Sequence, residues 1–154
     1  MFIINVEGET MTQRQTQNVQ IQLAIQTTQD GHTDNYAITE VGQAVKIGSQ
    51  LYLRYQESNS HQKIKVLFKV SEDNLLTIKR SVDAQVPTKL VFNRQKDQLI
   101  DYPTAYGNLS LVTHTHKMRL LISQAPISGK IELDYSLSSQ NNLVADYKLR
   151  LIFK

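Results

Sequence analysis

Apolar and polar residues alternate at every second position along most of the chain from Gln17 onward. Such a period of two is typical of β-strands that bury one face and expose the other. The clearest case is the segment 63–70, where Ile64, Val66 and Phe68 alternate with polar positions that are mostly lysine. The alternation predicts strands near residues 19–26, 36–41, 45–47, 51–55, 63–70, 76–80, 88–92, 98–102, 109–122, 131–137 and 145–153.

Short turns separate these segments. Asp30-Gly31 suits the positive φ angles of a tight hairpin, and Gly42 and Gly48 are expected to bracket a short strand at 45–47. Connections this short cannot cross over between parallel strands, so the strands should pair antiparallel in chain order. Closing such a sheet on itself buries its apolar face and removes unpaired edges. We therefore predict an all-β fold, a single closed antiparallel meander barrel of about eight to ten strands.

The composition fits one domain. A chain of 154 residues can bury one core, and the absence of cysteine excludes disulfides and thiolate metal sites. No apolar run approaches the roughly 18 residues that a membrane-spanning helix needs, so we expect no membrane association and a cytoplasmic location. The net charge of +3 is modest, and the 17 basic residues are spread along the sequence with acids nearby. This spread argues against nucleic-acid binding, which usually gathers cations on one face.

The start of the chain is expected to lie outside the barrel, with residues 1–16 as a leader and residues 17–154 as the domain. The codons for Glu7-Gly8-Glu9 can contain a purine-rich ribosome-binding sequence shortly before Met11. One hypothesis is therefore that Met11 is the natural start and that the preceding residues come from a misassigned gene start. The alternatives are a partly disordered leader and a short ordered N-terminal strand.

Five segments form a recognisable set: residues 50–55, 64–70, 75–81, 102–107 and 129–153. Together they resemble the YwiB-like family of bacterial proteins. The run from Tyr102 to Gly107 is similar to the family's Tyr-x-Thr-Pro-aromatic-Gly element, although Ala105 replaces the proline and Val82 stands where the family usually has glycine. The resemblance implies a small cytoplasmic, calycin-like (lipocalin-like) β-barrel with no established activity, cofactor or partner.

Two sets of residues suggest a ligand site inside the barrel. Arg80 shares a strand face with the apolar residues of 76–78, so its guanidinium should point toward the interior or its rim. There it would bind a carboxylate, or else cap the barrel end by contacting backbone carbonyls or a tyrosine. Tyr102, Thr104 and Tyr106 are expected to alternate on one strand face. Their hydroxyls would orient a polar ligand group or simply bond to the backbone.

Basic residues are expected on the outer face of neighbouring strands. They are Arg54, Lys63, Lys65 and Lys69, with Lys79 as a neighbour. An RNA-binding face would also present aromatic rings for base stacking, and Tyr52 is the one candidate. The alternative is that lysines on exposed strand faces only protect the sheet against edge pairing.

His114 and His116 are two residues apart on one predicted strand and so face the same side. They would supply two ligands to a metal ion, but the spacing identifies no third ligand, and solvated surface histidines are the alternative. The sequence also contains no recognisable nucleophile or general-base motif. We therefore predict no catalytic residue, no metal site and no cofactor.

The sequence thus predicts a non-enzymatic binding protein. The first hypothesis is that the barrel holds a small, partly apolar or carboxylate ligand in its interior. The alternative is an interaction module that uses the basic outer strand face for RNA or a protein partner. The sequence leaves the oligomeric state open.

Overall fold

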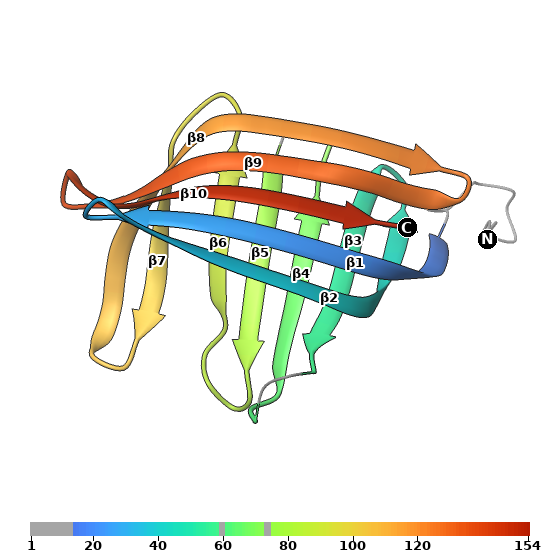
Figure 1. The fold of residues 1–154 in the computed structure, drawn as a ribbon, viewed down its shortest axis with the longest axis horizontal. Coiled ribbons are helices and arrows are strands. Elements are labelled where there is room, and N and C mark those ends of the chain that lie inside the picture. Colours follow the sequence, from blue (N-terminus) through green and yellow to red (C-terminus); the bar gives the residue numbers. More distant parts are fainter. Residues whose placement is uncertain (1–13, 59–60, 73–74) are drawn as a thin grey trace, which may run out of the picture.

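The computed structural model describes residues 14–58, 61–72 and 75–154 (Figure 1). The hypotheses about Met11 and the residues before it concern a part of the chain outside these ranges. None of the described residues forms a helix, so they include no helix long and apolar enough to cross a membrane. They form ten strands: β1 (Arg14–Gln29), β2 (His32–Ile47), β3 (Gln50–Glu57), β4 (Ile64–Val70), β5 (Leu75–Val82), β6 (Thr88–Asn93), β7 (Gln98–Thr104), β8 (Gly107–Gln124), β9 (Ile127–Ser139) and β10 (Asn142–Phe153).

The strands form one antiparallel sheet in the order β6-β5-β4-β3-β2-β1-β10-β9-β8-β7. Each strand except β6 pairs with the next one along the chain, and the first strand pairs with the last through Ile21–Thr28 and Asp146–Phe153. Figure 1 shows the long strands β1, β2, β9 and β10 crossing in front of the shorter β3–β6. The sheet therefore curls into a nearly closed barrel, and the predicted all-β antiparallel meander barrel is confirmed.

The barrel has a seam between β6 and β7, which are neighbours without a ladder of backbone hydrogen bonds. Two side-chain hydrogen bonds connect β6, or the residue just after it, to β8 beside this seam. Thr113 Oγ1 donates to the carbonyl of Val91 at 2.7 Å, and Arg94 Nη2 donates to the carbonyl of Met118 at 2.7 Å. These two bonds give backbone carbonyls beside the seam a hydrogen-bond partner.

Large side chains fill the barrel interior. The alternation predicted for β1 and β4 is confirmed, because Val19, Ile21, Leu23 and the even-numbered residues of 64–70 are buried. The fully buried residues include Phe68, Phe92 and Phe153, together with leucines and isoleucines of β1, β3, β5, β9 and β10. The ring of Phe92 contacts that of Tyr135 at a centroid distance of 4.5 Å, and Tyr135 stacks on Tyr147 at 4.7 Å.

Strand β2 differs from the sequence-based expectation. It runs through Gly42 as a single strand of 16 residues instead of restarting as a short strand at 45–47. A Cβ atom at Gly42 would lie 2.4 Å from the carbonyl oxygen of Arg54 and 2.7 Å from Cδ1 of Ile21. Glycine is therefore present because β3 and β1 approach the backbone closely, and not because the strand ends there. Strand β1 begins at Arg14, three residues before the predicted start of the domain, and residues 14–16 pair with β2.

A β-bulge in β8 changes which residues face inward. The pairing with β9 shifts between Thr115 and Lys117, which leaves His116 as the extra residue. Before the bulge the odd-numbered Thr113 is buried, and after it the even-numbered Met118 is buried. The sequence carries this signal, since its apolar positions change from odd to even at the same place.

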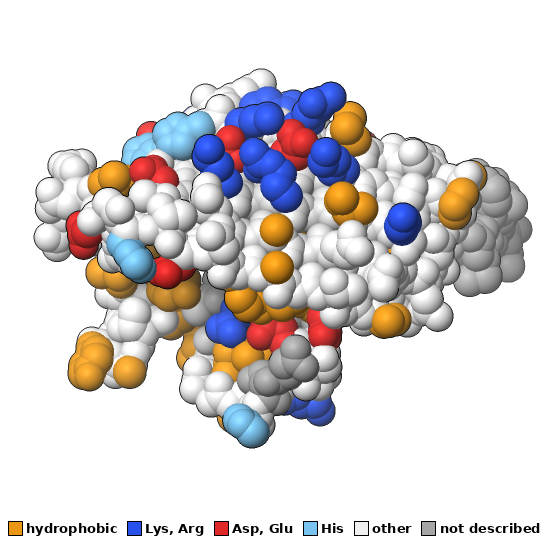
Figure 2. All heavy atoms as spheres, in the orientation of Figure 1, with side chains coloured by type: hydrophobic (Ala, Val, Ile, Leu, Met, Phe, Trp, Pro, Cys, Tyr) orange, Lys and Arg blue, Asp and Glu red, His pale blue; other side chains and the backbone are white. Residues whose placement is uncertain are grey.

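Charged side chains of both signs cover the outer face of β8, β9 and β10, as Figure 2 shows across the upper strands. Glu132 lies at the centre of one cluster, with Lys117 Nζ at 3.0 Å and Lys130 Nζ at 3.2 Å. Hydrogen bonds from Lys117 and then Lys130 lower the pKa of the Glu132 carboxyl from 4.5 to about 2. The folded state therefore prefers the ionised carboxylate more strongly than the unfolded chain does.

This pKa difference predicts a defined loss of stability in acid. Ionised Glu132 contributes to the free energy of unfolding in full above about pH 4.5. This contribution disappears as the pH falls toward about 2, where the carboxylate of the folded protein also takes up a proton. A Glu132→Gln variant should be less stable than the native protein near neutral pH and should lose less further stability between these two values. Urea unfolding midpoints across the range test this expectation. The same pH dependence in both proteins would contradict it.

Candidate functional site

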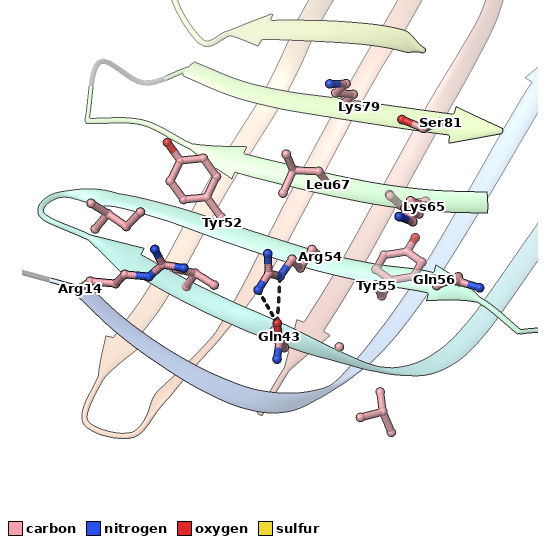
Figure 3. Close-up of a pocket in the computed structure, with 15 residues that line it drawn as sticks. Arg14, Gln43, Tyr52, Arg54, Tyr55, Gln56, Lys65, Leu67, Lys79 and Ser81 are labelled. Atoms are coloured by element: carbon pink, nitrogen blue, oxygen red, sulfur yellow. Dashed lines mark hydrogen bonds between the residues drawn. The ribbon is translucent and has the colours of Figure 1, made fainter. Parts of the chain in front are cut away.

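A groove lies on the outer surface of the barrel, across β2, β3, β4 and β5 (Figure 3). It encloses about 610 Å³, which is within the usual range of ligand sites. Its lining comes mostly from side chains that point away from the core, including the odd-numbered residues of 41–47 on β2 and the even-numbered residues of 52–56 on β3. This groove is therefore outside the barrel.

The groove follows from strand alternation and strand register. Gln43 pairs with Arg54, Arg54 with Leu67, and Leu67 with Lys79, so one residue from each of the four strands forms a row across the outer surface. A second row next to it contains Gln56, Lys65 and Ser81. Figure 3 shows β1 and β2 curving around one side of these rows. This curvature makes the outer surface concave.

The groove is strongly electropositive. Four cationic side chains line it (Arg14, Arg54, Lys65 and Lys79), and none of the described lining residues is acidic. The guanidinium of Arg54 donates through Nε to Oε1 of Gln43 at 2.9 Å, and this amide orients the cation without neutralising it. Lys65 and Lys79 are exposed. Cations within a concave surface reinforce one another's field, so the groove attracts anions.

The groove also has apolar and aromatic walls. Val45 lines it although only 4% of the residue is exposed, so it lies deep in the hollow. Leu67 and the ring of Tyr52 are partly exposed at its surface. The hydroxyl of Tyr52 donates to Oε1 of Gln50 at 2.7 Å, and the ammonium of Lys69 lies 5.7 Å from the ring centroid. The ring is thus held in place and already contacts a cation.

The structure brings together part of the predicted basic face. Arg54 and Lys65 line the groove, and Lys69 adjoins it through Tyr52. Lys63 does not line it but lies in the turn before β4, where its backbone N–H donates to Oδ1 of Asp83 at 2.8 Å. Arg54 and Lys65, which are far apart from Lys79 in the sequence, therefore lie with it in one groove whose described lining residues include no acid.

Sequence reasoning missed Arg14 and Gln43 as groove residues. Arg14 precedes the first strand that alternation predicts, and the pairing of Gln43 with Arg54 depends on strand register that the sequence does not specify. One signal was available. Val41, Val45 and Ile47 are apolar on the outer face of β2, which indicates that this face is partly covered.

Arg80 lies at one end of the barrel, not in the groove. Its side chain is 49% exposed, and its guanidinium is 3.9 Å from the carboxylate of Glu57. Tyr36 and Tyr55 are close to the same pair of charges. Burial, and then the neighbouring charge of Glu57, raise the pKa of both phenols above their usual value. Arg80 thus belongs to a polar cluster at the rim of the barrel.

Tyr102, Thr104 and Tyr106 do not form the expected row of hydroxyls. Tyr102 is half-buried on β7, near Tyr135 and Tyr147, whose pKa values are raised mainly by burial. Tyr106 lies in the turn after β7 and is fully exposed, because the strand ends at Thr104. Thr104 Oγ1 donates to the carbonyl of Gly107 at 2.6 Å and accepts the N–H of Tyr106 at 3.2 Å. Thr104 and Tyr106 therefore form a turn, and neither adjoins Arg80.

The two histidines of β8 have different partners. Nδ1 of His114 is 2.8 Å from the carboxylate of Asp97, in the connection between β6 and β7. Nε2 of His116 is 2.6 Å from Oγ of Ser136, which in turn donates to Asp146. Each ring is thus engaged separately. No group of three His, Cys, Asp or Glu side chains suited to a metal ion occurs among the described residues.

The fold and the groove together define a calycin-like β-barrel with a concave, electropositive outer surface. The chain belongs to the family described as Domain of unknown function (DUF1934), whose model matches residues 8–151. A solved structure, the YwiB protein from Bacillus subtilis, matches with a TM-score of 0.75 and 19% sequence identity, over 90% of this chain and 92% of that chain. This likeness confirms the resemblance seen in the sequence and supports the barrel fold. A search of curated proteins found no match.

Proposed function

We propose that this protein is a binding protein that takes an anionic ligand with a planar or apolar part in the outer groove. The observation that carries the proposal is the combination of Arg54, Lys65 and Lys79, an apolar and aromatic wall, and no carboxylate among the described lining residues, in one groove of about 610 Å³. Cations attract and orient the charged part of such a ligand, and Tyr52 and Leu67 contact its uncharged part.

The groove is a better candidate than the barrel interior. A ligand in the interior was the first hypothesis from the sequence, but fully buried side chains such as Phe68, Phe92 and Phe153 occupy the central volume. Displacing them would cost packing contacts that stabilise the fold. The groove needs no such displacement because Arg54, Lys65 and Lys79 are exposed and Tyr52 is partly exposed.

A dye with the matching chemistry tests the proposal. The dye 1-anilinonaphthalene-8-sulfonate carries one anionic group on an aromatic body, and its fluorescence reports binding. We expect the Lys65→Gln/Lys79→Gln double variant to bind it about tenfold more weakly, because two cations leave the groove. Both lysines are exposed, so the double variant should keep the stability of the native protein.

The matched control is the Lys96→Gln/Lys148→Gln variant, which removes the same charge at two exposed lysines outside the groove. It should bind the dye nearly as well as the native protein. An equal loss of dye affinity in the two variants would indicate a general charge effect. Unchanged dye affinity in both variants would show that the dye binds outside the groove. Either result contradicts the proposed function.

A further inference from the structure

We propose that the ligand of the groove is a single-stranded nucleic acid, with phosphates bound by Arg54, Lys65 and Lys79 and one base stacked on Tyr52. This inference rests on the proposed function and names its ligand class. The juxtaposition that carries it is a set of cations spread over three neighbouring strands beside a partly exposed aromatic ring.

The side chains of Arg54, Lys65 and Lys79 extend from separate points on the sheet. Arg54 and Lys79 occupy the same row with one strand between them, so their backbones are about 10 Å apart at the usual strand spacing. Lys65 lies two residues from Leu67 of that row, or about 7 Å along the strand. Cations arranged in two dimensions in this way suit a ligand with several separated charges. A chain of phosphodiesters is such a ligand.

Tyr52 supplies the contact that a purely electrostatic surface lacks. It lies on the same face of β3 as Arg54, two residues away, and its hydroxyl is fixed by Gln50. Proteins that bind single strands combine a positive groove along the backbone with aromatic rings on which bases stack. Lys69, which contacts the ring, is placed to meet the phosphate next to a stacked base.

The shape of the site favours a single strand over the other polyanions. Bases in a duplex are stacked on one another and are not available to Tyr52. An anionic bilayer presents a broad surface that cannot enter a hollow lined on several sides, whereas a flexible strand can follow it. The spread of basic residues along the sequence argued against nucleic acid, but the fold removes this objection by gathering them.

Fluorescence anisotropy with labelled ten-nucleotide oligouridylate and oligothymidylate tests the inference, with a duplex of the same length as a comparison. We expect both single strands to bind more tightly than the duplex, with an affinity that falls as salt rises. The Lys65→Gln/Lys79→Gln variant should show a shallower slope of log affinity against log salt, by about 0.7 for each lost phosphate contact. The Lys96→Gln/Lys148→Gln variant should keep the native slope.

Tyr52 is tested by a pair of substitutions. Tyr52→Leu removes the ring and should weaken oligonucleotide binding about tenfold. Tyr52→Phe keeps the ring and loses only the bond to Gln50, so it should bind nearly as well as the native protein. Equal affinities of the two variants would overturn the stacking assignment.

The dye experiment separates this inference from the function on which it rests. If binding of the dye depends on Lys65 and Lys79 but binding of neither oligonucleotide does, the groove binds anions and the nucleic-acid assignment is wrong. Binding to vesicles of phosphatidylserine and phosphatidylcholine is measured as the final comparison. If they bind through the same lysines while the oligonucleotides do not, the result overturns the inference in favour of a membrane surface. Binding of either oligouridylate or oligothymidylate that depends on Lys65 and Lys79 supports the inference.

Discussion

Replacing Phe92 with alanine is expected to lower the free energy of unfolding by about 3–5 kcal/mol. The Phe92 side chain is fully buried on β6, and its ring packs against Tyr135 at 4.5 Å. Truncation removes apolar surface from the core and leaves a cavity beside the seam between β6 and β7.

Urea unfolding followed by tyrosine fluorescence measures this change. Phe92→Leu is the control, since it keeps most of the apolar volume and should cost much less than the alanine variant. A loss below about 1 kcal/mol for Phe92→Ala would show that the site collapses or that the seam contributes little. Phe92 does not line the groove, so the folded fraction of the variant should still bind the anionic dye.

Replacing Gly42 with alanine should destabilise the protein by about 3 kcal/mol, at the upper end of the usual cost of overpacking. The new Cβ would meet the carbonyl oxygen of Arg54 at 2.4 Å, and this atom belongs to the backbone of the neighbouring strand. It would also meet Cδ1 of Ile21 at 2.7 Å. Gly42 is not among the residues with positive φ, so steric contact and not backbone conformation requires glycine.

The neighbouring Val41 provides the matched control for this substitution. Its side chain is 78% exposed, and Val41→Ala should change stability by no more than about 0.5 kcal/mol. Gly42→Ala should also weaken dye binding in the folded protein, because relief of the clash moves the β3 backbone that carries Arg54. A Gly42→Ala variant as stable as Val41→Ala would show that β2 and β3 separate without cost.

Alternation of apolar and polar residues was enough to predict the strands and most of their buried faces. Alternation is a local property, because successive side chains of a strand point to opposite sides whatever the strand pairs with. The segment 64–70 could therefore be oriented without knowledge of its neighbours, and Asp30-Gly31 marked a hairpin through its own φ preferences. Even the bulge at His116 left a trace in the change from odd to even apolar positions.

Where strands end and which side chains meet depend on contacts that form only in the folded protein. Tyr106 continues the alternation of Tyr102 and Thr104, yet it lies in a turn because the hydroxyl of Thr104 bonds to Gly107 and Tyr106 there. Gly42 reads as a strand end, yet it is required by the approach of Arg54 from another strand.

The groove is the clearest case of this dependence. Its cations Arg14, Arg54, Lys65 and Lys79 come from four strands and are far apart in the sequence. Each was visible as a basic residue, and alternation placed Arg54 and Lys65 on the outer face. Their assembly depends on the register of four ladders and on the curvature of β1 and β2. Register and curvature arise from contacts between distant segments, so a pattern read along one strand cannot specify them.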